Sequence, residues 1–321
     1  MIKFDISGSS LECFAVIKDL TQRTSARGGE YLDMNLTNKT GTINAKLWDY
    51  SSLVHGVFTA GDLVKVRGVL SQFNGQDQLK IERIRLVNDN DNIDPADYVK
   101  SADFSSEDMF NALYNIANNF SDNNLKLITT TILNEKKEKL LIWPAAFKLH
   151  HAIRGGLLYH TLSVVRLCEA VSSVYPFIDK DLLLAGAILH DVCKTEELAA
   201  NESGISTGYT LEGNLLGHLT KGANLVESTA KKLGINNEVV TLLMHMMLSH
   251  HGVPEYGSPV LPQFLEAILL NQLDNIDATA YEVLEEVENV PAGEFTGKVF
   301  CLDGRKLYNH ARKERKKPNI L

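Results

Sequence analysis

The stretch LAGAILHDVCKTEEL, at residues 184–198, decides how most of this chain is interpreted. A run of apolar and small residues leads into the adjacent pair His190 and Asp191, so the pair interrupts the pattern of a buried helix. Placing a polar group in a core without a partner costs about 2–7 kcal/mol. A ligand shared by both side chains would offset that cost.

The same interruption recurs in other apolar stretches of the chain. A single histidine of this kind is ordinarily a core residue with one hydrogen-bond partner, but the recurrence favours one shared ligand. The interrupting residues are His160 in GGLLYHTLSV, His218 in NLLGHL, His250 and His251 in MMLSHHG, and Asp274 in LLNQLDNIDA.

These imidazoles and carboxylates predict a site for divalent metal ions, since together they suit Mn, Fe, Co, Ni or Zn. The four cysteines are widely spaced and form no C-x-x-C pair, which argues against a disulfide framework and a cysteine-based structural zinc site. We expect one or two ions per subunit, because two ions suit in-line displacement at phosphorus. One ion would take His160, His190, Asp191 and Asp274, and the other would take His218, His250, His251 and a bridging Asp191.

Residues 11–87 have the pattern of strands. Polar and apolar residues alternate in TINAKLW (42–48) and LVKVRGV (63–69), and turn-forming residues stand at 27–29, 38–41, 60–62 and 74–76. Turns at roughly ten-residue spacing indicate a small antiparallel barrel of about five strands. We therefore predict an OB-fold.

A change of pattern divides the chain further. Residues 89–108 carry seven acidic residues and one lysine without an apolar period, which indicates an acidic linker. From residue 109 the apolar period becomes helical. The predicted fold class is therefore multidomain α+β. It comprises an OB-fold nucleic-acid-binding domain at 1–88, the linker at 89–108, an all-α metal-binding domain at 109–304 and a basic tail at 305–321.

Composition and charge narrow the class of protein. With 44% hydrophobic and 22% charged residues among 321, the chain is typical of a globular protein and unlike a low-complexity one. Its 32 basic and 40 acidic residues give a net charge of −8, which by itself argues against a nucleic-acid partner. However, residues 1–88 hold 11 basic and 9 acidic residues, and residues 305–321 hold 7 and 1. Two basic ends therefore flank an acidic middle.

The sequence carries no membrane signal. No apolar run reaches the roughly 18 residues of a spanning helix, and the opening MIKFDISGSSLECF lacks a basic segment followed by an apolar one. We expect a soluble, cytoplasmic protein without a membrane partner.

The order H…HD…H…HH…D resembles that of the HD-domain metal-dependent phosphohydrolases. Longer strings closely resemble the YhaM-type 3′-5′ exoribonucleases, in which an OB-fold precedes the HD domain, and this resemblance covers nearly the whole chain. The strings are NAKLWDY (44–50), HHAIRGGLLYHTLSV (150–164), LAGAILHDVCKTEEL (184–198), GYTLEGNLLGH (208–218), LSHHGVPEYGSPVLP (248–262) and FTGKVFCLDGRKLY (295–308).

The resemblance implies a hydrolase that depends on divalent metal ions, with Mn²⁺ expected and Co²⁺, Fe²⁺, Ni²⁺ or Zn²⁺ as alternatives. Such an enzyme removes nucleoside monophosphates from the 3′ end of single-stranded RNA, with DNA as an alternative substrate. The resemblance also implies a cytoplasmic homo-oligomer, for which a hexamer is the expected form.

Two residues are candidates for the catalytic role. Asp191 would bridge the ions, and Lys194 follows it by three residues, so a helical turn would place both on one face. The ammonium would then offset the charge of a scissile phosphate. A surface lysine is the alternative. In the family pattern HD-x-G-K the lysine matches, whereas Cys193 stands where glycine is common.

Arg154 and Asp277 are candidates for contacts with the substrate or the ligands. Arg154 would bind phosphate as a fork, with Gly155 and Gly156 allowing close backbone approach. Alternatively, the two glycines only start the helix that carries His160. Asp277 would orient a ligand histidine or a water on the metal, or would be a surface carboxylate.

In the barrel, aromatic and basic side chains are candidates for binding a single strand. Trp48 would stack on bases, and Lys46 and Arg67 would lie on a basic track along the strands. A core position for the aromatic ring and a solvated face for the basic residues are the alternatives. The same interpretation extends to Tyr31, Phe58 and Phe73, and to Lys65, Lys80, Arg83 and Arg85.

Two other classes of function remain open. One is an HD phosphohydrolase of small or cyclic nucleotides, although such a substrate has little need of a strand-binding barrel. The other is a non-catalytic single-strand-binding protein whose helical domain is a scaffold, although a scaffold has no physical reason to keep so many polar interruptions.

Overall fold

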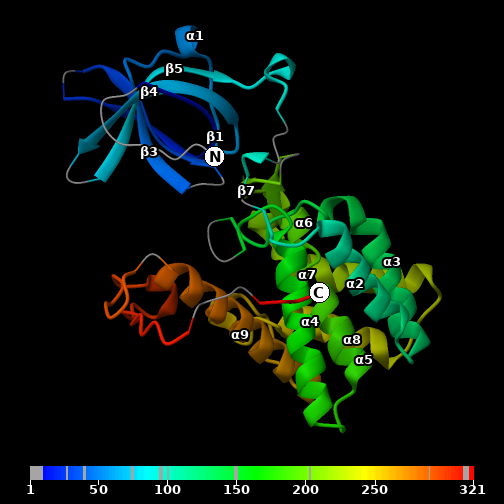
Figure 1. Cartoon of the computed structure of the whole chain (residues 1–321). Coiled ribbons are helices and arrows are strands. Elements are labelled where there is room, and N and C mark those ends of the chain that lie inside the picture. The colour runs from blue at the N-terminus through cyan, green and yellow to red at the C-terminus, as the bar shows by residue number, and fades with distance from the viewer. Residues whose placement is uncertain are drawn as a thin grey trace. The chain divides into compact units, whose positions relative to one another are not determined.

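The computed structural model describes residues 10–26, 28–38, 41–73, 76–93, 97–99, 101–147, 151–201, 204–288, 290–313 and 318–321. The chain forms two compact units (Figure 1). The first comprises Met1–Ser101 with Ala200–Thr207, and the second comprises Ala102–Ala199 with Gly208–Leu321. The boundary therefore falls inside the segment 89–108 that the sequence predicts as a linker.

Five strands of the first unit close a barrel in the order β1-β2-β3-β5-β4. β3 is parallel to β5 and every other pair is antiparallel. β1 closes the barrel because its first half pairs with β4 and its second half with β2. This arrangement confirms the predicted OB-fold. The strands are β1 (Ser10–Thr24), β2 (Glu30–Asn38), β3 (Gly41–Trp48), β4 (Leu63–Phe73) and β5 (Gln76–Leu86), and α1 (Ser52–His55) lies between β3 and β4.

The period-two pattern of the sequence fills the barrel. Along β2, Leu32, Met34 and Leu36 are at most 2% exposed, whereas the residues between them face outward and are half-buried. Phe58 is also in this core, so the prediction that it stacks on bases is wrong. The side chain of Phe73 lies outside the described residues. Beyond β5, the ring of Tyr98 contacts Phe14 edge-on at 5.4 Å, so the start of the predicted linker packs on the barrel.

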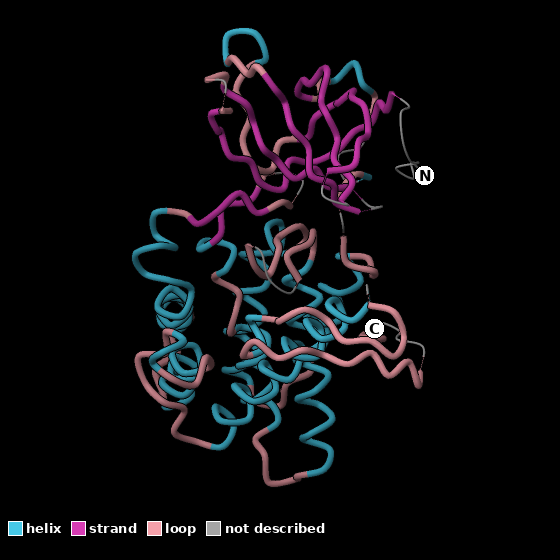
Figure 2. Tube along the Cα trace, turned by 90° about the vertical axis from the view of Figure 1, so that its left-hand side faces the viewer, coloured by secondary structure: helices cyan, strands magenta, loops and turns pink. Residues whose placement is uncertain are grey.

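The second unit is mainly helical, which confirms the predicted α+β class (Figure 2). α4 packs against α5 and α9, and α7 packs against α8. None of the described helices is both long enough and apolar enough to cross a membrane. The helices are α2 (Ser106–Asn118), α3 (Asn123–Leu140), α4 (Gly156–Val174), α5 (Lys180–Leu189), α6 (Lys194–Glu197), α7 (Leu211–Lys232), α8 (Glu238–Ser249) and α9 (Leu265–Glu288); the hairpin β6 (Leu198–Ala200) and β7 (Ser206–Tyr209) separates α6 from α7.

The end of the predicted basic tail packs on α4. Arg166 donates through Nε to the carbonyl of Ile320 at 2.8 Å, and Tyr159 donates to the carbonyl of Pro318 at 3.4 Å. The side chain of Ile320 is 2% exposed. Residues 314–317 of the tail lie outside the described residues.

The start of α4 depends on a close backbone approach. Gly155 is its N-cap, and the amide of Gly156 donates to the carbonyl of Ile153 at 2.9 Å. A Cβ on Gly156 would collide with the backbone carbonyl of His151. The two glycines therefore start the helix that carries His160, as the alternative interpretation of this motif holds.

The close contact between Gly156 and the backbone of His151 predicts opposite effects on stability for two glycine-to-alanine changes in the helical unit. Gly156→Ala should lower the free energy of unfolding by about 1–3 kcal/mol, because backbone cannot move aside as a side chain can. Gly222→Ala in α7 should raise it by about 0.5–1 kcal/mol, since the new Cβ would lie an ordinary 3.6 Å from Met247. Urea titrations followed by far-UV circular dichroism would measure both. Equal stabilisation by the two alanines would contradict the proposed contact.

Candidate metal centre

Five segments of the helical unit bring the predicted ligands together. His160 comes from α4, His190 and Asp191 follow α5, His218 lies in α7, His250 and His251 follow α8, and Asp274 lies in α9. α7 is bent at Gly217, whose φ of 68° is in the left-handed region, immediately before His218. Of the predicted ligands, all except His251 and Asp274 are at most 4% exposed.

The carboxylate of Asp191 lies at the centre of the cluster. Its Oδ2 is 3.5 Å from Nε2 of His160 and 3.4 Å from Nε2 of His190. Its Oδ1 is 3.2 Å from Nε2 of His218 and 3.7 Å from Nε2 of His250. Each oxygen thus faces a different pair of imidazoles.

The remaining two predicted ligands extend these two groups. Oδ1 of Asp274 lies 3.1 Å from Nε2 of His160 and 3.8 Å from Nε2 of His190. The ring of His251 lies 4.5 Å from that of His250 and 5.0 Å from that of His218, measured between centroids. The structure thus brings the residues of each predicted set close together, and both their division between two ions and the bridging role of Asp191 stay predictions.

Backbone carbonyls orient three of the imidazoles. Nδ1 of His190 lies 2.8 Å from the carbonyl oxygen of Ala187, and Nδ1 of His250 lies 2.9 Å from that of Met247. Nδ1 of His251 similarly lies 2.8 Å from the carbonyl oxygen of Tyr256. A carbonyl oxygen only accepts, so each Nδ1 carries the hydrogen, and the lone pair of the neutral ring is on Nε2.

Carboxylates orient the other two imidazoles in the same way. Nδ1 of His160 donates to Asp277 at 2.8 Å, and Nδ1 of His218 donates to Glu197 at 2.8 Å. A histidine that binds a metal through one nitrogen commonly donates from the other to such an oxygen. The rings of His160, His190, His218 and His250 therefore present to Asp191 the nitrogen that suits a cation.

Buried atoms without partners indicate that the cluster fits a cation. Asp191 Oδ1, His218 Nε2 and His250 Nε2 are buried and have no hydrogen bond of acceptable geometry. Buried polar atoms nearly always have a partner, so three orphans that converge need an explanation. A divalent cation would satisfy all three, and imidazole with carboxylate is a suitable donor set for one.

The protonation of the cluster also suits a cation. Burial lowers the pKa of His250 to about 3, so its ring is neutral near pH 7. Burial opposes the charge of Asp191, but Lys194 and His190 hold its pKa well below the usual value. Burial also disfavours charge on His160, but hydrogen bonds to Asp274 and Asp277 raise its pKa to about 10. A cation would displace the proton of His160, because metal binding competes with protons for the same lone pair.

Lys194 reaches the centre of the cluster. Its Nζ lies 2.6 Å from Oδ2 of Asp191, and its side chain is 16% exposed. The indole of Trp143 donates to its backbone carbonyl at 3.0 Å. The structure thus places Lys194 beside the predicted ligands rather than at the surface.

Cys193 occupies the position that is often glycine in the HD-x-G-K pattern. Its φ of −81° and ψ of 1° are accessible to any residue, so glycine is not required there. Burial raises the pKa of its thiol to about 12. Because the thiolate is the reactive form, this cysteine is poorly reactive near pH 7.

Asp277 and His151 lie behind the predicted ligand His160. Asp277 is 7% exposed and accepts hydrogen bonds from His160, from Ser163 and from Nε2 of His151 at 3.2 Å. The ring of His151 lies 3.8 Å from the ring of Tyr281, between centroids. The contacts of Asp277 are those of a residue that orients His160.

From the sequence, His151 is left outside the predicted ligand set, and Glu197 has no predicted role. His151 contacts Asp277, and Glu197 contacts His218, across segments that only the fold brings together. The hydrophobic period of the sequence therefore gave little signal for either residue. His150, next to His151, lies outside the described residues. Arg154 is half-buried, and its backbone carbonyl accepts from the amide of Ala102 at 2.9 Å.

The barrel presents one group of the predicted strand-binding residues together. Trp48 is 39% exposed and stacks on Tyr31 with ring centroids 4.5 Å apart. Nζ of Lys46 lies 5.4 Å and 5.6 Å from the centroids of these two rings. Trp48 is thus at the surface and outside the core. Arg67 lies on β4, where its Nε is 3.8 Å from Glu82.

Comparison with known proteins identifies one domain. In a structure of a replication protein A heterotrimer bound to single-stranded DNA, one chain matches 27% of this chain, with 18% identity and a TM-score of 0.22; the match spans 63% of that chain. The second OB-fold domain of replication protein A from Methanococcus maripaludis matches 26% of this chain over 85% of its own, with 20% identity and a TM-score of 0.21. Residues 157–279 match the family model of the HD domain. This match to the HD domain spans every predicted ligand from His160 to Asp274.

Proposed function

We propose that this protein is a divalent-metal-dependent 3′-5′ exonuclease that degrades single-stranded RNA to nucleoside monophosphates. The observation that carries the proposal is the convergence of buried Nε2 atoms on both oxygens of Asp191. Such a site suits two ions, and two ions suit displacement at a phosphodiester. Mn²⁺ as the native metal, RNA rather than DNA, and a cytoplasmic homo-oligomer are parts of the proposal that rest on the family resemblance.

The residues of the cluster would hold two ions at the phosphodiester. His160, His190, Asp191 and Asp274 would hold one ion, and His218, His250, His251 and Asp191 the other. Bound ions would supply Lewis acidity and offset charge on the entering and leaving oxygens. Carbonyls and carboxylates behind the five rings keep each Nε2 directed inward, so the site is organised before the substrate arrives.

Lys194 would stabilise charge on the reacting phosphate. Its ammonium is already held beside Asp191 at 2.6 Å in a poorly solvated environment. A fixed positive charge at such a site stabilises developing negative charge without a reorganisation step. Burial opposes this charge, but Asp191 raises the pKa of Lys194 above its usual value, so the ammonium persists at neutral pH.

The outward face of β2 and β3 would hold the single strand. Tyr31 is paired with Trp48 across the two strands, and Asp33 is paired with Lys46 two residues along. Bases stack on exposed aromatic rings regardless of sequence, while a nearby cation attracts the phosphates. OB-folds use this same pair of strands for oligonucleotides. A strand-binding face favours a polymeric substrate over a small nucleotide.

A ladder assay tests the activity. With Mn²⁺ and 5′-labelled single-stranded RNA, the protein should produce products that shorten from the 3′ end, and a chelator should abolish them. Asp191→Asn should lower the rate by more than about 10²-fold, because it removes the carboxylate shared by both sets of ligands. Asp303→Asn, at an exposed position of the same unit, is the matched control.

Each other outcome of this assay identifies a rival. Metal-dependent hydrolysis of mononucleotides without a ladder would support a small-nucleotide phosphohydrolase. Binding of RNA without turnover would support a non-catalytic protein. A ladder that persists in Asp191→Asn would refute the proposed mechanism.

The contacts behind His160 predict a loss of metal affinity on mutation. His151→Phe keeps a ring against Tyr281 but removes the hydrogen bond to Asp277. We expect Mn²⁺ to bind about 10- to 100-fold more weakly, the range for residues that orient metal ligands. Calorimetric titration of the metal-free protein would measure this. The control is His245→Phe, because the ring of His245 only accepts from the amide of Gln263, and this variant should leave the affinity for Mn²⁺ unchanged. An unchanged affinity in His151→Phe would contradict the role of its hydrogen bond to Asp277.

The aromatic pair on the barrel predicts weaker strand binding without a defect in the metal centre. Trp48→Ala should weaken binding of an oligonucleotide by about 1–3 kcal/mol, the value of one base stacked on an aromatic ring. Hydrolysis of a small phosphodiester should not change. Fluorescence anisotropy in chelator would measure binding, with Phe177→Ala, an exposed aromatic of the helical unit, as the control. Equal affinities for both variants would place the strand elsewhere.

A further inference from the structure

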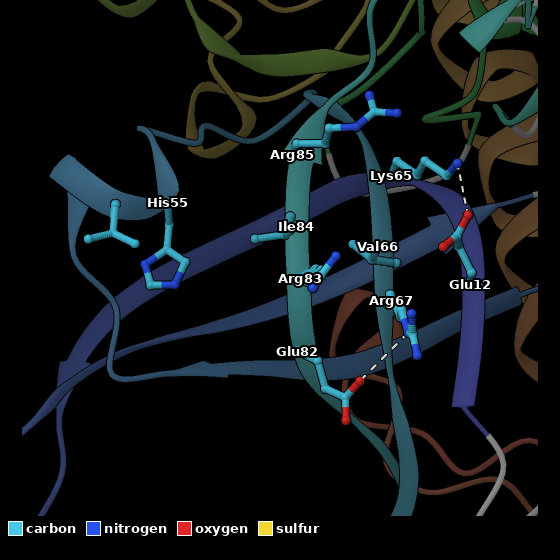
Figure 3. A pocket seen from close by; sticks show the side chains of 10 residues that line it. Glu12, His55, Lys65, Val66, Arg67, Glu82, Arg83, Ile84 and Arg85 are labelled. Atoms are coloured by element: carbon cyan, nitrogen blue, oxygen red, sulfur yellow. Dashed lines mark ion pairs between the residues drawn. The ribbon is translucent and has the colours of Figure 1, made fainter.

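A second candidate site lies on the β1, β4 and β5 side of the barrel, apart from the Tyr31–Trp48 face. It is a pocket of about 510 Å³, within the range of small-molecule sites (Figure 3). Its residues come from four elements, and neither the HD domain nor the paired rings of β2 and β3 contribute. The lining residues are Glu12, Val54, His55, Lys65, Val66, Arg67, Glu82, Arg83, Ile84 and Arg85.

The floor of the pocket sets like charges against each other. Lys65 on β4 is directly paired with Arg85 on β5, and Arg67 is directly paired with Arg83. Like charges directly opposite each other across two strands destabilise a sheet. Two such pairs stand in succession here, and an anionic ligand would relieve the repulsion between them.

Carboxylates within the barrel unit compensate only part of this charge. Glu12 lies 2.8 Å from Nζ of Lys65, and Glu82 lies 3.8 Å from Nε of Arg67. Arg85 donates two hydrogen bonds to Asp91, at 2.7 Å and 2.6 Å. Among the described residues, no carboxylate lies within ion-pair distance of Arg83. Its guanidinium lines the pocket (Figure 3).

A β-bulge produces this arrangement. The pairing of β4 with β5 shifts between Arg67 and Gly68, so that Gly68 faces Ile81 and Glu82 has no direct partner. As a result Glu82 and Arg83, although consecutive, are both exposed. Bulges re-aim side chains in this way and are frequent next to functional sites.

The wall of the pocket on the α1 side is formed by Val54 and His55, of which Val54 is apolar. Val54 of α1 lines it and is 77% exposed, and its neighbours Leu53 and Val57 are 97% and 69% exposed. A purely inorganic anion would use the cationic floor and leave this wall in water. A nucleotide has both a phosphate for the floor and an apolar base for the wall.

We propose that this pocket binds a nucleotide, with its phosphate at Arg83 and Arg67 and its base against Val54. The site is separate from the HD domain and goes beyond the proposed hydrolysis. The nucleotide is either a free mononucleotide or one residue of a single strand, since both present the same phosphate and base. A guanidinium fork matches phosphate geometry in either case.

Binding measurements on the full chain in the presence of a chelator test the pocket without turnover. The probes are AMP, inorganic phosphate and an eight-residue oligouridine, titrated by calorimetry. Arg83→Gln should weaken nucleotide binding by about 5- to 10-fold and flatten its salt dependence. Lys18→Gln removes one positive charge from β1, away from the pocket, and should change the affinity less than twofold.

A stability measurement separates binding from folding. Because Arg83 faces Arg67 and has no acidic partner among the described residues, Arg83→Gln should leave the melting temperature unchanged or raise it. A weaker nucleotide complex from a protein that is no less stable is the signature of a binding residue. A lower melting temperature would instead assign Arg83 a structural role and overturn the proposal.

The probes also identify the source of the nucleotide. An effect of Arg83→Gln on AMP supports a mononucleotide site, and an effect on the oligouridine alone supports a contact with the strand. Inorganic phosphate that binds as tightly as AMP would overturn the role of Val54. Affinities unaffected by Arg83→Gln would overturn the site as a whole, and neither result would bear on the ladder assay.

Discussion

The buried carboxylate of Asp191 is the interaction on which the helical unit depends. It lies in a core where an uncompensated charge is costly, with Lys194 on one side and four imidazoles facing its two oxygens. The helices α4, α5, α7 and α8 each place a polar group next to it, so the geometry of the centre depends on how these helices pack. A cation shared by these groups would offset the cost of burying the charge of Asp191, and it would link the helices that carry the groups.

The layer behind the imidazoles uses a general property of helices. The last carbonyls of a helix have no partner within it, and His190 and His250 stand just past the ends of α5 and α8. Each donates from Nδ1 to a carbonyl of the preceding turn, at Ala187 and Met247. The helix ends thereby gain a donor, and the rings become oriented with Nε2 inward. Two structural needs are met by one residue at each position.

The barrel divides its outer surface between two kinds of chemistry. The β2–β3 face carries stacked rings with a lysine above them, whereas the β4–β5 face carries opposed cations beside Val54 of α1. The first arrangement suits successive bases of a strand, and the second suits one nucleotide with its phosphate. Both arrangements follow from the alternation of the strands, which directs every second side chain outward. The bulge at Arg67 also changes which side chains of β4 and β5 face outward.

Period and residue type are local properties, so the OB barrel, the helical period and the polar interruptions could be predicted from the sequence. These interruptions are His160, His190, Asp191, His218, His250, His251 and Asp274. The residues that lie behind and beside these side chains, in contrast, are known only from how distant segments pack. His160 meets Asp277 across 117 positions, and His218 meets Glu197 across a hairpin. Likewise, Arg67 lies opposite Arg83 because of the register next to the bulge. Trp48 is exposed because it stands at an outward-facing position of β3. Contacts between distant segments arise from packing and register, which no local pattern contains.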